Sequence, residues 1–220
     1  MNQNDLPVLW YFADPMCSWC WGFTPIIEDI LKSYEGKLNC ALVLGGLRTG
    51  AANTMSAEQR DEILHHWQEV HKMTGQSFTF DGAMPEGFIY DTEPACRAVA
   101  AISGINAGLI FPLFKSIQAA FYKEGLNVTQ TEVLADLAHQ LGVDQAVFLS
   151  EFESAQADKK VKAHFAQTRQ FGVRGFPTLV LQSGSRYQLL NNGYRTLAEL
   201  KPEIDAWLLN RDKLEQQEST

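Results

Sequence analysis

Apolar residues form short runs between polar turns near both ends of the chain, and these runs predict strands. Residues 8–13 are almost continuously apolar, and residues 38–44 repeat this character after a helix-like segment that reaches about residue 35. Within that segment apolar side chains recur every three to four positions, the spacing of one buried helix face. A helical crossover joins parallel strands, so we expect a strand–helix–strand unit with its strands buried on both faces.

A second strand-forming region lies near the other end of the chain. Residues 178–182 and 186–190 flank the turn Ser183-Gly184-Ser185, and this arrangement predicts an antiparallel hairpin. The pattern Thr196-x-x-Glu199 predicts the start of a final helix, because such side chains cap a first turn. Pro202 would either kink that helix or move its start later.

Between these regions the apolar positions have a helical period, which predicts about five helices between residues 56 and 171. The capping patterns Ser56-x-x-Gln59 and Thr129-x-x-Glu132 mark two of the expected helix starts. Residues 75–91 interrupt the period and predict a long loop. Its aromatic side chains, Phe78, Phe80, Phe88 and Tyr90, either pack beneath the loop, which we favour, or line a groove.

Composition limits the classes of function. The 220 residues, 45% of them hydrophobic, suffice for one domain with an insertion or for two small domains. The net charge of −8 and the absence of a Lys/Arg stripe argue against nucleic acid as a partner. No apolar run approaches the roughly 18 residues of a membrane span. The first seven residues lack the basic region of a secretory signal, so we expect a cytoplasmic protein unless a leader preceded this chain.

The candidate chemistry lies between the first strand and the helix that follows it. The turn dipeptide Asp14-Pro15 leads into Cys17-Ser18-Trp19-Cys20 at the helix start. Helix N-termini favour negative charge, and the thiolate is the reactive form of cysteine. We therefore expect Cys17 to be the exposed sulfur that attacks a substrate disulfide, and Cys20, about one turn further in, to resolve the mixed disulfide.

A structural zinc knuckle is the alternative interpretation of this cysteine pair. Zinc needs about four ligands, usually from a second Cys-x-x-Cys or a histidine pair. The other cysteines, Cys40 and Cys96, stand alone, and the histidines show no ligand spacing. We therefore favour redox chemistry and expect neither a metal nor a cofactor. Cys40 lies inside an apolar strand and is interpreted as a small buried residue.

Three stretches together resemble a known family. They are Phe12-x-Asp14-Pro15-x-Cys17-x-Trp19-Cys20, Glu93-Pro94-Ala95-Cys96-Arg97-Ala98 and Gly172-Val173-x-Gly175-Phe176-Pro177-Thr178. The chain resembles the thioredoxin-fold superfamily, its DsbA-like branch, and within that the FrnE-related subgroup of predicted dithiol–disulfide isomerases. The resemblance implies an α/β thioredoxin fold with a large all-helical insertion between the second and third strands. It implies a thioredoxin-like domain of residues 1–50 and 172–220 and an insertion domain of residues 51–171.

The resemblance also implies roles for particular residues. Pro177 would be cis and lie against Cys17, leaving the backbone of Phe176 to pair with an extended substrate. The loop after the second strand would return near the cysteines, where Arg48 could stabilise a thiolate, hold a substrate carboxylate, or simply be solvated. Cys96 would either lie within reach of the cysteine pair or be a buried thiol on a helix face.

Aromatic residues near the cysteines could form an apolar rim that binds substrate. Trp19, Trp21 and Phe176 are the candidates, with Arg174 beside the proline loop, although Trp21 could equally be a core residue. The dipeptide between the cysteines is uncharged, so we expect a moderately reducing couple. Thioredoxin-like proteins often hold a buried acid six residues before the first cysteine, and Tyr11 occupies that position here.

The predicted function is a thiol–disulfide oxidoreductase or isomerase acting on protein or peptide disulfides and thiols, with glutathione as a further candidate partner. One alternative is a glutathione-dependent enzyme like the kappa transferases or chromene carboxylate isomerases, which usually carry serine at the first cysteine position. Another is a non-catalytic adaptor that binds peptides along the proline loop. Retention of both Cys17 and Cys20 favours the first function. The sequence gives no prediction of oligomeric state.

Overall fold

A single mixed sheet organises the computed structural model, which describes residues 6–218, with side-chain surroundings through residue 211. Within the described residues the sheet has four strands in the order β2-β1-β3-β4. Their bounds are β1 Val8–Ala13, β2 Asn39–Leu44, β3 Thr178–Ser183 and β4 Arg186–Asn192. Part of the N-terminal stretch on which the expectation about a leader rests lies outside the described residues.

The strand directions match the sequence prediction. Strand β1 pairs in parallel with β2, from Val8 opposite Asn39 to Ala13 opposite Leu44. Strand β3 runs antiparallel to both β1 and β4. The predicted α/β thioredoxin fold is confirmed, whereas the proposed division into two domains stays a prediction.

Eight α-helices surround the sheet in the described part of the chain. They are α1 Ser18–Ser33, α2 Ala57–Thr74, α3 Glu93–Ile105, α4 Ile110–Tyr122, α5 Thr131–Gln140, α6 Gln145–Phe152, α7 Ala155–Gln170 and α8 Leu197–Glu218. Helices α2 to α7 all lie between β2 and β3, so the fully described insertion holds six α-helices rather than about five. None of the helices in residues 6–218 combines the length and apolar character that crossing a membrane requires.

Two of the three predicted helix starts are correct. Ser56 forms the expected capping box, in which its Oγ accepts from the N–H of Gln59 at 3.2 Å. At the last helix the side chain of Glu199 accepts from the N–H of Thr196 at 2.8 Å, and α8 continues through Pro202 from a start at Leu197.

The third predicted start, at Thr129, is wrong. Helix α5 begins only at Thr131, with Gln130 at its N-cap. The Thr129 hydroxyl donates instead to Asn127 Oδ1 at 2.7 Å, and a local side-chain bond of this kind competes with helix capping.

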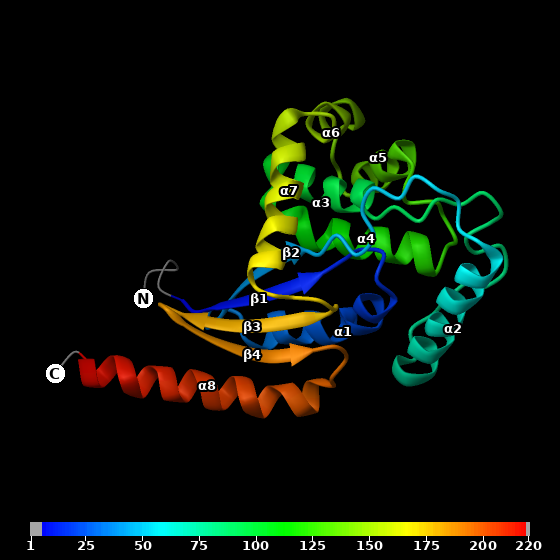
Figure 1. Ribbon diagram of the computed structural model, residues 1–220. Coiled ribbons are helices and arrows are strands. Elements are labelled where there is room, and N and C mark those ends of the chain that lie inside the picture. The colour runs from blue at the N-terminus through cyan, green and yellow to red at the C-terminus, as the bar shows by residue number, and fades with distance from the viewer. Residues whose placement is uncertain (1–5, 219–220) are drawn as a thin grey trace.

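Both faces of the sheet are covered, but unequally. On one face Leu9 and Tyr11 belong to the main core, together with Ile27 of α1 and Ile204 of α8. On the other face Phe12, Val43 and Val180 form a small cluster against residues that follow α7. Figure 1 shows α8 running along the β4 side, while α3 to α7 gather on the side of β2.

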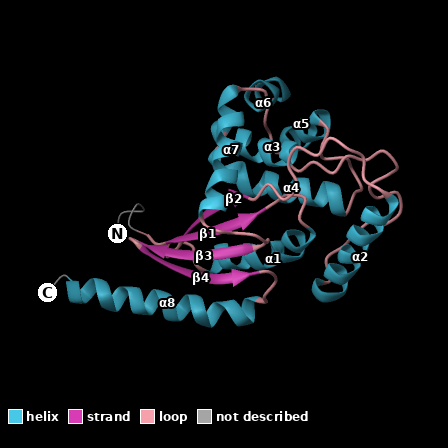
Figure 2. Cartoon of the chain, in the orientation of Figure 1, coloured by secondary structure: helices cyan, strands magenta, loops and turns pink. Residues whose placement is uncertain are grey.

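The segment between α2 and α3 is a loop, as predicted, and is drawn without helix or strand in Figure 2. Its aromatic side chains pack beneath it, which confirms the favoured interpretation. The ring of Phe78 lies 5.5 Å from that of Trp67 on α2, and Phe88 and Tyr90 are buried. Tyr90 has a second role because it also lines the cleft described below.

Helix α2 is held close to α1 at a glycine. A Cβ atom on Gly22 would lie 2.8 Å from Cγ1 of Val70 and 2.9 Å from Cγ2 of Thr74, both on α2. Only glycine therefore permits this close approach of the two helices. The approach matters because it places the last turns of α2 beside the start of α1.

We expect Gly22→Ala to destabilise the protein by up to about 2 kcal/mol. Overpacking of about 1–3 kcal/mol outweighs the gain of about 1 kcal/mol that alanine brings to a helix interior. The matched control is Gly104→Ala in α3, where a Cβ would meet only the side-chain ends of Glu151 and Lys160. Those ends can move, so this variant should be as stable as wild type or more so. Urea denaturation measures both, and a Gly22→Ala protein as stable as Gly104→Ala would contradict the packing argument.

Candidate active site

The cysteine pair follows a turn that Asp14 fixes. The N–H of Cys17 donates to the carbonyl of Asp14 at 3.1 Å, and the N–H of Met16 donates to its carboxylate at 2.9 Å. The turn ends at Cys17, whose extended backbone makes it the N-cap of α1. Cys17 therefore stands one position before the first residue of α1, Ser18.

The Cys17 sulfur lies between the start of α1 and the proline loop. Its side chain is only 6% exposed and makes no capping hydrogen bond. The thiol instead faces the carbonyl of Phe176, with 3.7 Å between Sγ and O. The unpaired N–H groups of the first helical turn favour negative charge at this position.

Cys20 lies one turn further along α1 and has no exposed surface. Burial raises the pKa of the Cys20 thiol well above its usual value, and interaction with Cys17 raises it further. The two cysteines therefore differ in reactivity, since Cys20 keeps its proton at neutral pH while Cys17 faces a cleft.

Tyr11 on β1 and Asp14 directly after it lie near Cys20. Tyr11 is completely buried, and its pKa is raised well above the usual value by burial and by the neighbouring Cys20. Asp14 is also completely buried, and burial raises its pKa although N–H groups of Leu47 and Met16 stabilise its charge. Tyr11 thus occupies the position where thioredoxin-like proteins often hold a buried acid, and Asp14 supplies a buried carboxyl group nearby.

Cys96 is connected to this network from α3. Its side chain is fully buried, and its Sγ donates to Asp14 Oδ2 at 3.4 Å. Burial and the adjacent Asp14 both raise the pKa of this thiol. The first turn of α3 therefore packs against the cysteine turn through Asp14. Cys40, in contrast, pairs with Leu9 within the sheet.

The peptide bond between Phe176 and Pro177 is cis. The Phe176 ring packs on the loop that follows β2, where a Cβ on Gly45 would lie 2.2 Å from the ring's Cζ atom. Glycine at residue 45 is therefore required for the ring to occupy this place. The two loops that flank Cys17 contact each other as a result.

A cleft of about 380 Å³ opens above Cys17. Five separate segments of the chain form its walls. Its lining residues are Met16, Cys17, Ser18, Trp19, Leu47, Arg48, Ile63, His66, Trp67, Tyr90 and Phe176. Trp19 and Phe176, two of the candidate substrate-binding residues, thus lie together with Cys17.

The other two candidates lie elsewhere. Trp21 is 5% exposed, and its Nε1–H donates to the carbonyl of Ser77 at 3.0 Å, which fixes the loop after α2. Arg174 is exposed and lines a different groove, on the sheet face beside Phe171 and Tyr187. Neither residue lines the cleft at Cys17.

Sequence reasoning missed the wall of the cleft that α2 contributes. The helical period predicts a helix after Ser56, but it does not say what the face that carries Ile63 and Trp67 contacts. Gly22 could have indicated the contact between α1 and α2, because it lies inside a helix, where no turn requires a glycine.

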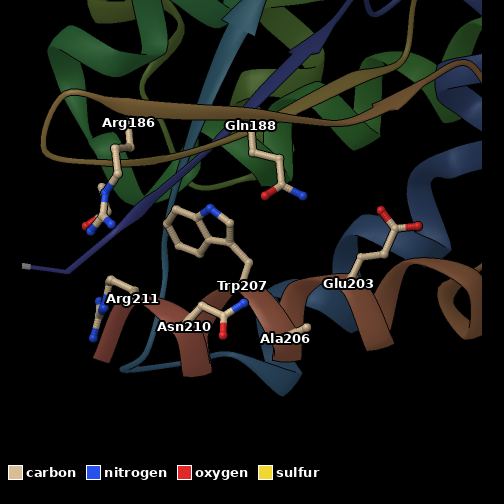
Figure 3. Close-up of a pocket in the computed structure, with 8 residues that line it drawn as sticks. Arg186, Gln188, Glu203, Ala206, Trp207, Asn210 and Arg211 are labelled. Carbon is tan, nitrogen blue, oxygen red and sulfur yellow. The ribbon is translucent and has the colours of Figure 1, made fainter. Parts of the chain in front are cut away.

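Another hollow, of about 310 Å³, lies between β4 and α8. Figure 3 shows the indole of Trp207 rising from α8 toward Gln188 on β4, with Arg186 at one end. No cysteine lines it. Among the residues that the structure describes, no group of three or more His, Cys, Asp or Glu side chains is placed to hold a metal ion.

The sheet order, the Cys-x-x-Cys pair at the start of α1 and the proline loop beside it define a dithiol protein of the thioredoxin fold. More particularly, the chain belongs to the DSBA-like thioredoxin domain family, which it matches over residues 8–201. Membership of the FrnE-related subgroup stays a prediction.

Solved structures of similar proteins extend this result. A provisionally assigned protein disulfide isomerase from Nitrosomonas europaea is 46% identical, with a TM-score of 0.88 over 93% of this chain and 98% of that one. The cytosolic disulfide reductase DsbM from Pseudomonas aeruginosa is 29% identical, with a TM-score of 0.74 over 94% of this chain and 99% of its own. A further structure of DsbM contains glutathione.

Curated relatives are more distant. The ClpXP adapter protein SpxH of Halalkalibacterium halodurans is 24% identical over 178 residues, which are 78% of this chain and 57% of the relative. SpxH of Bacillus subtilis is 23% identical over 175 residues, covering 78% and 56%. The chain thus spans little more than half the length of these relatives.

We expect iodoacetamide at neutral pH to modify Cys17 at least about tenfold faster than the other cysteines, because reactivity follows thiolate content and access. Cys20 and Cys96 are fully buried, and desolvation raises the pKa of Cys40 to about 12. Peptide mass spectrometry over a time course measures the order of modification. In urea all four cysteines should react at similar rates. Equal labelling of Cys17 and Cys20 in the native protein would contradict the assignment of Cys17 as the more reactive sulfur.

Proposed function

We propose that this protein exchanges thiols and disulfides, with Cys17 as the attacking sulfur and Cys20 as the resolving one. One observation carries the proposal. The Cys17 sulfur faces a cleft at the N-terminus of α1, while Cys20 is buried behind it with a raised pKa. Membership of the DSBA-like family supports thiol–disulfide oxidoreductase activity in general.

The exchange has two steps. The Cys17 thiolate attacks one sulfur of a substrate disulfide, a Cys17–substrate disulfide forms, and the other substrate sulfur leaves as a thiolate that takes a proton. Cys20 then loses its proton and attacks the Cys17 sulfur, which releases the second substrate thiol. Two electrons pass from the dithiol to the substrate, and two molecules of a small thiol such as glutathione can restore the dithiol.

The proline loop supplies the place for an extended substrate. Trp19 and Phe176 line the cleft together with Cys17, and Pro177 follows Phe176 in the chain. Trp21 and Arg174 do not line it, so among the four candidate substrate-binding residues only Trp19 and Phe176 are placed to contact a substrate there. The Phe176 carbonyl lies 3.7 Å from the Cys17 sulfur, so a peptide bound at that sulfur would lie beside the proline loop.

The direction we favour is reduction or isomerisation of protein and peptide disulfides in a reducing compartment. Two similar proteins support this choice, since one is named a cytosolic disulfide reductase and the other a provisional disulfide isomerase. A reducing compartment keeps such a pair in the dithiol form that both activities need.

An adaptor that binds peptides without redox chemistry is the second candidate function. The SpxH relatives, which are named ClpXP adapters, favour it. Adaptor function requires neither sulfur, so the cysteine variants below separate it from the first candidate. A kappa-transferase-like or chromene carboxylate isomerase-like activity is less favoured because Cys17 stands where those enzymes usually carry serine.

We expect Cys17→Ser to abolish insulin reduction and the refolding of scrambled ribonuclease, because it removes the attacking sulfur. Cys20→Ser should instead accumulate mixed disulfides with substrate proteins, since no resolving thiol remains. Non-reducing gel electrophoresis measures the trapped species, and Cys40→Ser is the control with both reactive sulfurs intact. Activity that survives in Cys17→Ser would overturn the proposed function, and equal trapping by both variants would overturn the assignment of roles.

A further inference from the structure

We infer that the cleft selects small peptide disulfides that carry a carboxylate near the sulfur atoms, and that the guanidinium of Arg48 receives this carboxylate. The inference rests on the proposed function, because it concerns the substrate that meets Cys17. It makes Arg48 a specificity-determining residue.

The backbone at Arg48 is fixed from two directions. The N–H of Leu47 donates to Asp14 Oδ2 at 2.7 Å, which joins the loop to the cysteine turn. The N–H of Arg48 donates to Thr92 Oγ1 at 3.2 Å, and its carbonyl accepts from the N–H of Thr92 at 2.8 Å. Arg48 thus projects from a loop whose position is set by the cysteine turn itself.

The side chain of Arg48 is also guided toward the cleft. Its Cζ atom lies 5.3 Å from the centre of the Tyr90 ring, a cation–π geometry. Tyr90 is in turn buried, and its hydroxyl donates to the carbonyl of Met16, next to Cys17. Less side-chain entropy is therefore lost when Arg48 binds an anion than for a fully free arginine.

The charges around the cleft favour an anion. Arg48 is exposed, and in the described part of the chain its guanidinium makes no ion pair with a carboxylate. His66, the other cationic candidate in the lining, lies 3.2 Å from Glu69. No Asp or Glu lines the cleft, and the buried Asp14 below it is occupied by backbone N–H groups. The positive charge in this lining contrasts with the net charge of −8 of the whole protein.

The size of the cleft indicates a small ligand. Its volume of about 380 Å³ lies at the lower end of the roughly 300–1,000 Å³ found for small-molecule sites. A guanidinium matches a carboxylate with two parallel hydrogen bonds, so a carboxylate near the disulfide can be held while the sulfur reaches Cys17. A short peptide disulfide combines the required size, charge and sulfur chemistry.

The test compares three disulfides in single-turnover oxidation of the pre-reduced protein, followed by tryptophan fluorescence. Glutathione disulfide carries carboxylates, bis(2-hydroxyethyl) disulfide is neutral and cystamine is cationic. Each oxidises Cys17 and Cys20 to a disulfide and is itself reduced to two thiols, so no other reductant is needed. The variants are Arg48→Gln, Arg48→Lys and the matched control Arg186→Gln, an exposed arginine at the distant hollow beside α8.

We expect Arg48→Gln to lower the ratio of the glutathione disulfide rate to the neutral disulfide rate about fivefold, the scale of an exposed ion pair. The ratio of the cystamine rate to the neutral rate should rise. Arg48→Lys should restore part of the first ratio, and Arg186→Gln should leave both ratios at their wild-type values. Added salt should reduce the preference of the wild type and have less effect on Arg48→Gln.

Equal slowing of all three disulfides by Arg48→Gln would overturn the inference, because Arg48 would then act on the Cys17 thiolate rather than on the substrate. Unchanged ratios would overturn it as well. Either result leaves the proposed function standing. If the wild-type dithiol reduces none of the three disulfides and also fails to reduce insulin, the proposed function itself fails.

Discussion

The site depends on one buried carboxylate. Asp14 has no exposed surface, and its oxygens accept backbone N–H groups from Met16 and Leu47 together with the Cys96 thiol. Because a buried carboxylate needs such partners, the cysteine turn, the loop after β2 and the start of α3 are drawn to one point. Three segments that are distant in sequence thus share a single ionisable centre, directly behind the reactive pair.

Packing, rather than charge, sets the remaining walls. Gly22 allows α2 to approach α1, and Gly45 allows the Phe176 ring to lie on the loop after β2. Both glycines act by the absence of a side chain, at positions where another segment must come close. The cleft is therefore shaped by small residues in its supports as much as by the large residues that line it.

Local rules predicted much of the fold. The apolar runs located the strands, the Ser56 capping box located α2, and the position of Cys17 and Cys20 at a helix start followed from the strand and turn before them. Local rules failed where two local interactions compete, as at Thr129, whose hydroxyl bonds Asn127 rather than the helix. They also failed for Trp21, because an indole suits a core or a rim equally and only the tertiary fold chooses between them. The cis bond at Pro177 came from family resemblance and not from the residues alone.

The unequal exposure of the two sulfurs has a consequence for stoichiometry. Only Cys17 borders the cleft, and Cys20 has no surface open to solvent. Two separate partners cannot therefore cap both sulfurs at once in the folded molecule, so a dead-end species with a doubly blocked dithiol is sterically forbidden. A partner bound to Cys17 can be released by Cys20 from behind or by a second thiol that enters through the cleft.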